Sequence, residues 1–278
     1  FFYTPTRPTA MLRSLVGSEM CIRDSFGGDR GGYSDHGRRW IQKWVEENKQ
    51  WKKIIQSYAA AISFSDAMIG RLIDKIKNSS YADNTIIVLW SDHGMHMGEK
   101  ENIEKFTLWE RSTRVPLILS YPKMIKPGLR CDQPVSLMDI YPTLVELTGY
   151  EKPDHLDGKS LVPQIEDPSL LTSPVISSYQ FSWTEKPYAA HAVRSMNHRY
   201  IYYPDIGLEE LYDHQIDHNE WFNVAYKPEN KKIIENHRKV LLEMLPELSW
   251  KNQIPEGYLI DYKGNINVLN YSELSVLN

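Results

Sequence analysis

The feature that most constrains the fold is an apolar run that ends abruptly in polar residues. Residues 85–90 read TIIVLW, which is β-branched, aromatic and uncharged, and Ser91 and the triplet Asp92-His93-Gly94 follow at once. Such a run is typical of a buried strand. In open α/β sheets, ligands bind at the carboxyl ends of the strands. The sequence therefore predicts a carboxylate and an imidazole at the ligand-binding edge of a sheet.

Helical and strand-like segments alternate around this run. Apolar residues recur at spacings of three, four and seven over residues 51–77, which predicts a helix packed on the sheet. Residues 113–121, TRVPLILSY, predict a neighbouring buried strand, and residues 135–149 predict a second helix that ends at Gly149. This order predicts an α/β fold in which helices cover a mixed sheet.

The start of the helix within residues 135–149 can be placed from its capping residues. Pro142 lacks an amide hydrogen and fits best in the first turn, which favours Asp139 as the N-cap. Ser136 and Asp139 also have the spacing of a capping box.

After about residue 165 the pattern changes to short β-prone pieces. The segments PVISSY, HAVRS, RYIYYP and EELYDH, with turns between them, predict a small antiparallel sheet. An amphipathic helix follows, and its apolar side comprises Ile233, Ile234, Val240, Leu241, Met244 and Leu245. We therefore divide the chain into an α/β part at residues 26–165, an α+β subdomain at 166–250 and a tail of unassigned structure at 251–278.

Residues 1–25 stand apart from this organisation. Residues 5–25, PTRPTAMLRSLVGSEMCIRDS, closely resemble the translated read-through of a sequencing adaptor. The stretch has no sustained period and no capped helix. We expect residues 1–25 to make few contacts with the core; a natural flexible arm is the alternative.

Bulk properties exclude several classes of protein. A net charge of −4 argues against a nucleic-acid binder, which would be strongly basic. No apolar run approaches the roughly 18 residues of a membrane span. Two cysteines, Cys21 and Cys131, provide no disulfide framework. The chain does not begin with Met and shows no signal peptide, so we expect a fragment of a longer protein.

The Asp92-His93 pair could provide half of a metal site. Carboxylate oxygen suits calcium and magnesium, and imidazole widens the choice to zinc or manganese. Two ligands cannot complete a coordination shell, so other loops would have to contribute. The alternative is local: Asp92 caps a turn and His93 hydrogen-bonds nearby.

The wider context resembles the sulfatase family of the alkaline-phosphatase-like superfamily. After SDHG come a Gly-Glu pair, Lys105 and then ERSTRVPLIL, in the order and at spacings similar to those of the family. The segments YAAAISFSDAMIGRLIDKI, PVSLMDIYPTLVELTG and LDGKSLVPQI resemble its flanking elements. Residues 191–225 resemble its carboxyl-terminal subdomain, particularly in iduronate-2-sulfatase-like members. The resemblance covers residues 50–245 and implies an alkaline-phosphatase-like sheet and hydrolysis of sulfate esters, with sulfated glycans as substrates.

The resemblance also implies roles for individual residues. Asp92 and His93 fall on the family's metal-ligand pair, usually for calcium, and Lys105 on the lysine that binds the sulfate group. His96 could donate a proton to the leaving group, and His191 could contact the substrate. The alternatives are a solvated surface lysine for Lys105 and satisfied structural histidines for His96 and His191.

One part of the family pattern is absent from the sequence. Sulfatases carry a Cys-x-Pro-Ser-Arg signature whose cysteine becomes the formylglycine nucleophile, and this chain contains no such signature. We expect formylglycine in a missing amino-terminal half and the chain alone to be inactive. A phosphatase or phosphodiesterase of the same superfamily, or a non-catalytic sulfoglycan-binding pseudoenzyme, remains as an alternative. The resemblance implies a lysosomal, periplasmic or secreted location.

Overall fold

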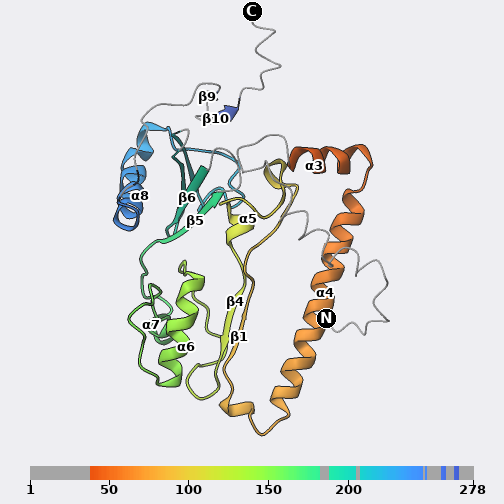
Figure 1. The fold of residues 1–278 in the computed structure, drawn as a ribbon, viewed down its shortest axis with the longest axis vertical. Helices are drawn as coiled ribbons and strands as arrows, with labels where there is room; N and C mark the ends of the chain where they lie inside the picture. The colour runs from red at the N-terminus through yellow and green to blue at the C-terminus, as the bar shows by residue number, and fades with distance from the viewer. Residues whose placement is uncertain are drawn as a thin grey trace, which may run out of the picture. The chain divides into compact units, whose positions relative to one another are not determined.

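The computed structural model describes residues 38–181, 188–204, 207–246, 248, 258–260 and 266–268 (Figure 1). The chain forms two compact units. The first contains the chain up to Phe106 together with Val115–Pro127, and the second contains Thr107–Arg114 and the chain from Gly128 on. Residues 1–25 and most of the tail lie outside the described residues, and the boundary near residue 165 stays a prediction.

The first unit contains the long helix and the strand that leads to Asp92. Its elements are α3 (Arg38–Glu47), α4 (Trp51–Lys77), η1 (Ala82–Asn84), β1 (Ile87–Trp90), β2 (His96–Met97), η2 (Glu99–Glu101), β3 (Ile103–Glu104) and β4 (Leu117–Ser120). β1 pairs with β4, and β2 pairs with β3, both antiparallel. The two predicted strands are therefore confirmed as neighbours.

The predicted burial of these strands is wrong for the described residues. Trp90 and Ile118 are 50% and 55% exposed, the other residues of the two strands are half-buried or exposed, and the described sheet contains only these two strands. The helix prediction matches the bounds of α4, but no residue of α4 is buried. The predicted packing of this helix on the sheet is therefore not found in the described part of the chain.

The second unit is built around a four-stranded antiparallel sheet. Its elements are α5 (Glu110–Thr113), η3 (Leu137–Asp139), α6 (Ile140–Thr148), α7 (Val162–Glu166), β5 (Val175–Phe181), β6 (Tyr188–Arg194), β7 (His198–Tyr203), β8 (Leu208–Asp213), η4 (Pro228–Asn230), α8 (Lys231–Met244), β9 (Tyr258–Ile260) and β10 (Ile266–Val268). The strand order is β5-β6-β7-β8, each pair antiparallel. The small carboxyl-terminal sheet and its helix are thus confirmed, within a mixed α/β chain.

The core of this unit lies between the sheet and α8. Buried side chains of three strands meet two from the helix: Val193, Tyr200, Tyr202, Leu211, Ile234 and Leu241. The predicted apolar side is therefore correct at Ile234 and Leu241, which are buried, and at Ile233, Val240 and Leu245, which pack against the same core. It is wrong at Met244, which is 65% exposed because it is the last residue of the helix.

The capping prediction is half right. Ser136 is the residue whose side chain accepts a backbone hydrogen bond, from Met138, and Asp139 accepts one from the backbone of Ser136. The capping box therefore forms around η3. Asp139 occupies the N-cap position of α6, as predicted, but its side chain makes no cap hydrogen bond to that helix, and its other oxygen accepts from the backbone of Lys159. Gly149 ends α6 with φ 73°, as predicted. None of the described helices is long and apolar enough to cross a lipid bilayer.

Candidate functional site

Asp92 and His93 lie just beyond the carboxyl end of β1, in the first unit. Asp92 is largely exposed, and one of its oxygens accepts a 3.0 Å hydrogen bond from the backbone of His93. The His93 ring is 33% exposed, and its Nδ1 lies 2.8 Å from the carbonyl oxygen of Gly94. The local contacts that the sequence allowed as an alternative are thus both present.

These contacts leave one further atom of each side chain, Asp92 Oδ2 and His93 Nε2, able to offer a lone pair to a ligand. A carbonyl oxygen can only accept, so Nδ1 of neutral His93 carries the hydrogen and Nε2 keeps its lone pair. Nε2 lies 3.5 Å from Oδ2 of Asp92. A cation about 2.4 Å from both atoms would see them at roughly 90°, a usual angle between neighbouring ligands. The pair is therefore geometrically able to provide two ligands of a metal shell.

His96 occupies a different environment from His93. It lies in β2, its side chain is fully buried, and Nδ1 is 3.2 Å from the carbonyl oxygen of Glu99. The carboxylate of Glu99 accepts a 2.7 Å hydrogen bond from the backbone of Met97. These contacts fit the structural alternative for His96, and a catalytic role for it stays a prediction.

Lys105 follows β3 directly, where the β2–β3 pair ends. In this pairing Glu104 of β3 lies opposite His96 of β2. Lys105 is therefore the next residue along the chain after the one that pairs with His96. The Lys105 side chain is partly buried, and Nζ lies 5.7 Å from the centre of the Phe106 ring. The first unit contains four of the predicted site residues: Asp92, His93, His96 and Lys105.

His191 belongs to the second unit. It lies in β6 opposite Ser178 of β5, and its Nδ1 is 2.8 Å from the Ser178 hydroxyl. This cross-strand hydrogen bond is compatible with either reading of His191. Its predicted contact with substrate stays a prediction.

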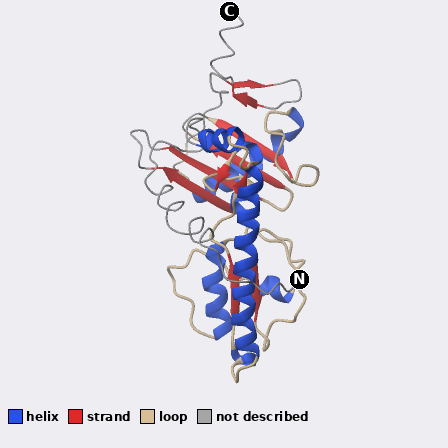
Figure 2. Cartoon of the chain, turned by 90° about the vertical axis from the view of Figure 1, so that its right-hand side faces the viewer, coloured by secondary structure: helices blue, strands red, loops and turns tan. Residues whose placement is uncertain are grey.

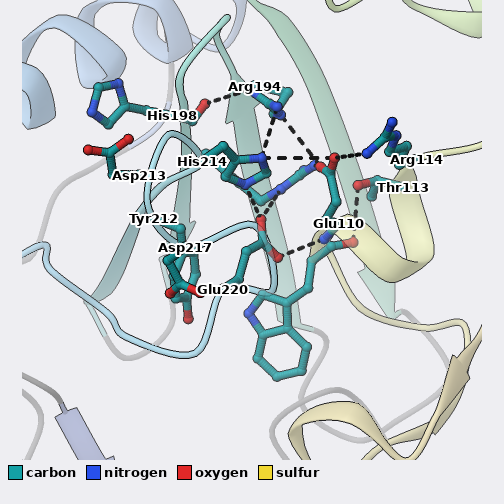
Figure 3. Close-up of polar contacts among 12 residues, drawn as sticks. Glu110, Thr113, Arg114, Arg194, His198, Tyr212, Asp213, His214, Asp217 and Glu220 are labelled. Carbon is teal, nitrogen blue, oxygen red and sulfur yellow. Dashed lines mark hydrogen bonds and ion pairs between the residues drawn. The ribbon is translucent and has the colours of Figure 1, made fainter.

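The sequence interpretation missed a buried charge network in the second unit. Glu110 of α5 lies beside Arg194, with Glu220 and His214 close by (Figure 3). A second arginine of the sheet, Arg199, pairs with both glutamates. Arg199 donates to Glu220 Oε1 at 2.7 Å and to Glu110 Oε2 at 2.5 Å. The fifth member, His214, lies 2.8 Å from Glu220 Oε1 through Nε2.

The arginines and His214 set the charge state of both carboxylates. Burial alone raises the pKa of Glu110, but the charge and hydrogen bond of Arg199, with the charge of Arg194, outweigh it and leave the pKa lowered. Burial likewise raises the pKa of Glu220, and the hydrogen bond from His214 and the charge of Arg199 outweigh it. Both side chains are therefore ionised at neutral pH.

The arginines also fix the tautomer of His214. Arg194 Nη2 lies 2.9 Å from Nδ1 of His214, and a guanidinium can only donate. Nδ1 therefore accepts, and Nε2–H donates to Glu220.

Glu110, His214 and Glu220 are also the one group of three or more metal-ligand side chains that the described residues bring within reach of a common ion, with ligand atoms within 4.8 Å of one another. Two carboxylates here already meet two guanidinium groups, so the charges balance without a metal ion. A cation would have to displace Arg199, which is only 2% exposed. The geometry supports an ion-pair network at this place.

The network holds residues 107–114 against the sheet. Arg199 donates to the carbonyl oxygen of Leu108 at 3.0 Å, and the backbone of Glu110 donates to Glu220 Oε2 at 2.7 Å. Beside it, the Trp109 indole donates to Glu210 Oε2 at 2.7 Å. The sequence signal for this network is the presence of Arg199 and Glu210 inside otherwise strand-like runs, where a charge must be paired if it is buried.

Comparisons with known proteins agree with this fold. The family model described as Sulfatase matches residues 27–150, and the model described as N-sulphoglucosamine sulphohydrolase, C-terminal, matches residues 98–247. A sulfatase of Formosa agariphila is 40% identical over 81% of this chain and 43% of its own length. An N-acetylglucosamine-6-O-sulfatase of Bacteroides thetaiotaomicron is 31% identical over 78% of this chain and 40% of its own length.

Solved structures give the same result. One, in complex with its substrate D-glucosamine-2-N,6-O-disulfate, is 26% identical with a TM-score of 0.62, over 83% of this chain and 46% of its own. A phosphonate monoester hydrolase of Agrobacterium radiobacter shares the fold with a TM-score of 0.60 and 23% identity, over 79% of this chain and 46% of its own. The chain thus spans less than half the length of each of these four proteins.

Proposed function

Because this chain belongs to the sulfatase family, we propose that it is part of an enzyme that hydrolyses sulfate esters, and that it contributes Asp92, His93 and Lys105 to the site. The observation that carries the proposal is the pair of lone pairs on Asp92 Oδ2 and His93 Nε2, 3.5 Å apart just beyond β1. They provide a carboxylate and an imidazole that can share one divalent cation.

The proposed roles follow from the charge of the substrate. A sulfate ester keeps its negative charge at any ordinary pH. Asp92 and His93 would hold a divalent cation, proposed as calcium, which when bound supplies positive charge to polarise the ester oxygens. The ammonium of Lys105 would bind the sulfate group and stabilise the charge that develops as the ester bond breaks.

These residues bind and polarise but do not attack sulfur. Formylglycine is the proposed nucleophile, and the sequence contains no signature for it. We therefore expect this chain alone not to turn over sulfate esters, because loss of a nucleophile removes many orders of magnitude of rate. Its affinity for calcium should also be weak, since calcium takes six to eight oxygen ligands.

The proposed substrates are sulfated glycans. One relative is named N-acetylglucosamine-6-O-sulfatase, and one similar solved structure holds the substrate D-glucosamine-2-N,6-O-disulfate, which supports a sulfated sugar. The finer proposal is an iduronate-2-sulfatase-like specificity, which rests on the sequence resemblance of residues 191–225. A lysosomal, periplasmic or secreted location accompanies this proposal.

The test joins this chain to the portion of the Formosa agariphila sulfatase that it does not match, and assays the product on an aryl sulfate. Asp92→Ala and Lys105→Ala should each lower kcat/KM at least a hundredfold. The matched controls, Asp83→Ala and Lys126→Ala on the surface of the same unit, should leave it unchanged. The isolated chain, assayed in parallel, should show no turnover.

The outcomes separate the candidate functions. Silent Asp92 and Lys105 variants in an active enzyme would refute the assigned roles. Preference for an aryl phosphate or phosphonate would favour the second candidate function, a phosphoryl-transfer enzyme. The observation that favours this candidate is the fold shared with a phosphonate monoester hydrolase. Sulfoglycan binding without turnover would indicate a pseudoenzyme. Comparing 6-O-sulfated glucosamine with 2-O-sulfated iduronate decides the finer specificity.

A further inference from the structure

The proposed metal ligands lie in a segment that has no regular secondary structure. β1 ends at Trp90 and β2 begins at His96, and residues 91–95 between them form neither helix nor strand (Figures 1 and 2). No ladder of backbone hydrogen bonds holds such a segment, whereas a metal site requires ligands that are held close to one geometry. The local contacts of Asp92 and His93 therefore determine how well the pair can bind a cation.

Three hydrogen bonds made by side chains within residues 91–94 hold the pair. The backbone of His93 donates to Oδ1 of Asp92 at 3.0 Å, and Oδ2 lies 3.5 Å from Nε2 of His93. Nδ1 of His93 donates to the carbonyl oxygen of Gly94 at 2.8 Å. The Ser91 hydroxyl donates to the carbonyl oxygen of His93, also at 2.8 Å. Of the three side chains, Ser91 is the one that is not a proposed ligand.

The Ser91 bond acts on the peptide that joins His93 to Gly94, because the carbonyl of His93 belongs to that peptide. Gly94 has no Cβ, so its backbone has more freedom than that of any other residue type. The carbonyl that accepts from the His93 ring lies just beyond this glycine. By holding the peptide on the other side of Gly94, the Ser91 hydroxyl restricts where that carbonyl can lie. Ser91 therefore secures the acceptor for Nδ1.

The acceptor matters because it selects the tautomer of His93. A neutral imidazole has one N–H and one lone pair, and the nitrogen with the lone pair is the one that binds a metal ion. With the hydrogen on Nδ1, the lone pair is on Nε2, near Oδ2 of Asp92. With the hydrogen on Nε2, the lone pair would face the carbonyl oxygen of Gly94. In metal sites, loss of such an outer contact costs about 10–100-fold in metal affinity.

A purely structural role for Ser91 makes a different prediction. Ser63 of α4 also donates to a backbone carbonyl oxygen, that of Ala59, at 2.9 Å, and this bond satisfies the carbonyl without involving a histidine ring. If Ser91 did no more than this, its removal would lower stability and leave the His93 ring unchanged. Ser63 is therefore the matched control in the same unit.

We propose that Ser91 is a positioning residue for the metal ligand His93. Its hydroxyl holds the peptide before Gly94, which keeps the imidazole hydrogen on Nδ1 and the lone pair of Nε2 available to the cation. The inference deepens the proposed function, and it rests on that function only in taking His93 as a metal ligand.

The first test observes the ring in the isolated full chain, without a metal ion. Nitrogen-15 NMR of labelled histidines distinguishes the two tautomers at about pH 8, where an imidazole is ordinarily neutral, and His93→Gln identifies the signal. His93 should be almost entirely the Nδ1–H tautomer. Ser91→Ala should raise the population of the other tautomer at least fivefold. Ser91→Thr, which keeps the hydroxyl, and Ser63→Ala should leave the ring unchanged.

The second test titrates calcium into the joined polypeptide and measures the affinity by calorimetry. Ser91→Ala should weaken calcium binding at least tenfold, while Ser91→Thr and Ser63→Ala should bind as tightly as the unchanged protein. The sulfatase activity of Ser91→Ala should fall at limiting calcium and recover as calcium is added, because the hydroxyl is not proposed to touch the substrate.

The two tests fail separately. An unchanged tautomer in Ser91→Ala, or calcium affinity equal to that of the unchanged protein, would overturn the positioning role. A joined polypeptide that binds calcium equally well with His93→Gln would refute the metal role in the proposed function. The tautomer measurement in the isolated chain would still decide whether Ser91 controls the ring.

Discussion

At the scale of single residues, paired charge determines what the second unit can bury. Arg199 is almost fully buried, and it is tolerated because Glu110 and Glu220 accept its hydrogen bonds. Removing one partner from such a cluster leaves an uncompensated charge in a poorly solvated place, which costs far more than the intact pair contributes. An exposed pair such as Arg130 with Asp132 has no such consequence, because water solvates both groups.

Arg199→Leu should therefore destabilise the second unit by about 3–5 kcal/mol. The variant leaves Glu110 and Glu220 ionised near each other, with only Arg194 and His214 beside them. Urea unfolding followed by circular dichroism measures the loss. Arg130→Leu is the control and should cost about 1 kcal/mol or less. Equal losses of unfolding free energy in the two variants would show that burial does not determine how much these ion pairs contribute to stability.

The pH dependence of stability should report His237. Burial lowers the pKa of this histidine below 6.5, its Nδ1 donates to the carbonyl oxygen of Ile233, and the Ser195 hydroxyl donates to Nε2. The unfolded chain then binds a proton more readily than the folded one. Stability is therefore full above pH 6.5 and is lost as the pH falls through the folded pKa.

His237→Gln should reduce this slope, which for one group is at most about 1.4 kcal/mol per pH unit. Unfolding free energies measured between pH 7 and pH 5 provide the comparison. Burial also lowers the pKa of His198, so a smaller slope should persist in the variant. An unchanged slope would contradict the attribution of this pH dependence to His237.

At the scale of elements, a close backbone approach shapes the loop that leads to Lys105. Gly98 has φ 115°, and a Cβ at this position would lie 2.6 Å from Cη2 of Trp51, the first residue of α4. The loop between β2 and β3 therefore lies directly against the start of α4. The Gly-Glu pair found by resemblance has a physical reason: the glycine permits the contact, and Glu99 holds the backbone of Met97.

Gly98→Ala should accordingly destabilise the first unit by about 2–4 kcal/mol, since backbone strain and a steric clash add. Gly128→Ala isolates the strain, because Gly128 has φ 79° and nothing within 4 Å of its added Cβ. That control should cost about 1–2 kcal/mol. Thermal unfolding of both variants measures the difference, and equal losses would show that the Trp51 ring moves aside at no cost.

At the scale of the whole molecule, residues 1–25 should contribute nothing to stability, because an adaptor-like stretch was never selected to pack on this fold. Deleting them should leave the melting temperature essentially unchanged. Truncation before α8 is the contrasting change, since it removes Ile234 and Leu241 from the core and should abolish folding of the second unit. A fall of several degrees on deleting residues 1–25, about 1 kcal/mol or more, would show that they belong to the fold.

The sequence by itself determined the elements. Period and turn residues placed α4, β1, β4, the carboxyl-terminal sheet and α8, because these signals lie within a few neighbouring residues. The motif order also placed Asp92, His93 and Lys105 in one segment, and the resemblance supplied the family. His93 Nδ1 forms a hydrogen bond with the carbonyl oxygen of Gly94, which leaves Nε2 available. This contact is local in the sequence, but only the structure shows it.

Only the tertiary structure brought Glu110, Arg199 and Glu220 together. Arg199 precedes Glu220 by 21 residues and Glu110 precedes it by 110. No spacing rule encodes such a contact, because it depends on the register of β7 and β8 and on the path of the chain after β8. The exposure of α4 and of the β1–β4 pair was hidden from the sequence for the related reason. An apolar pattern indicates that a surface is more stable when it is buried. Whether it is buried depends on whether another part of a polypeptide packs against it.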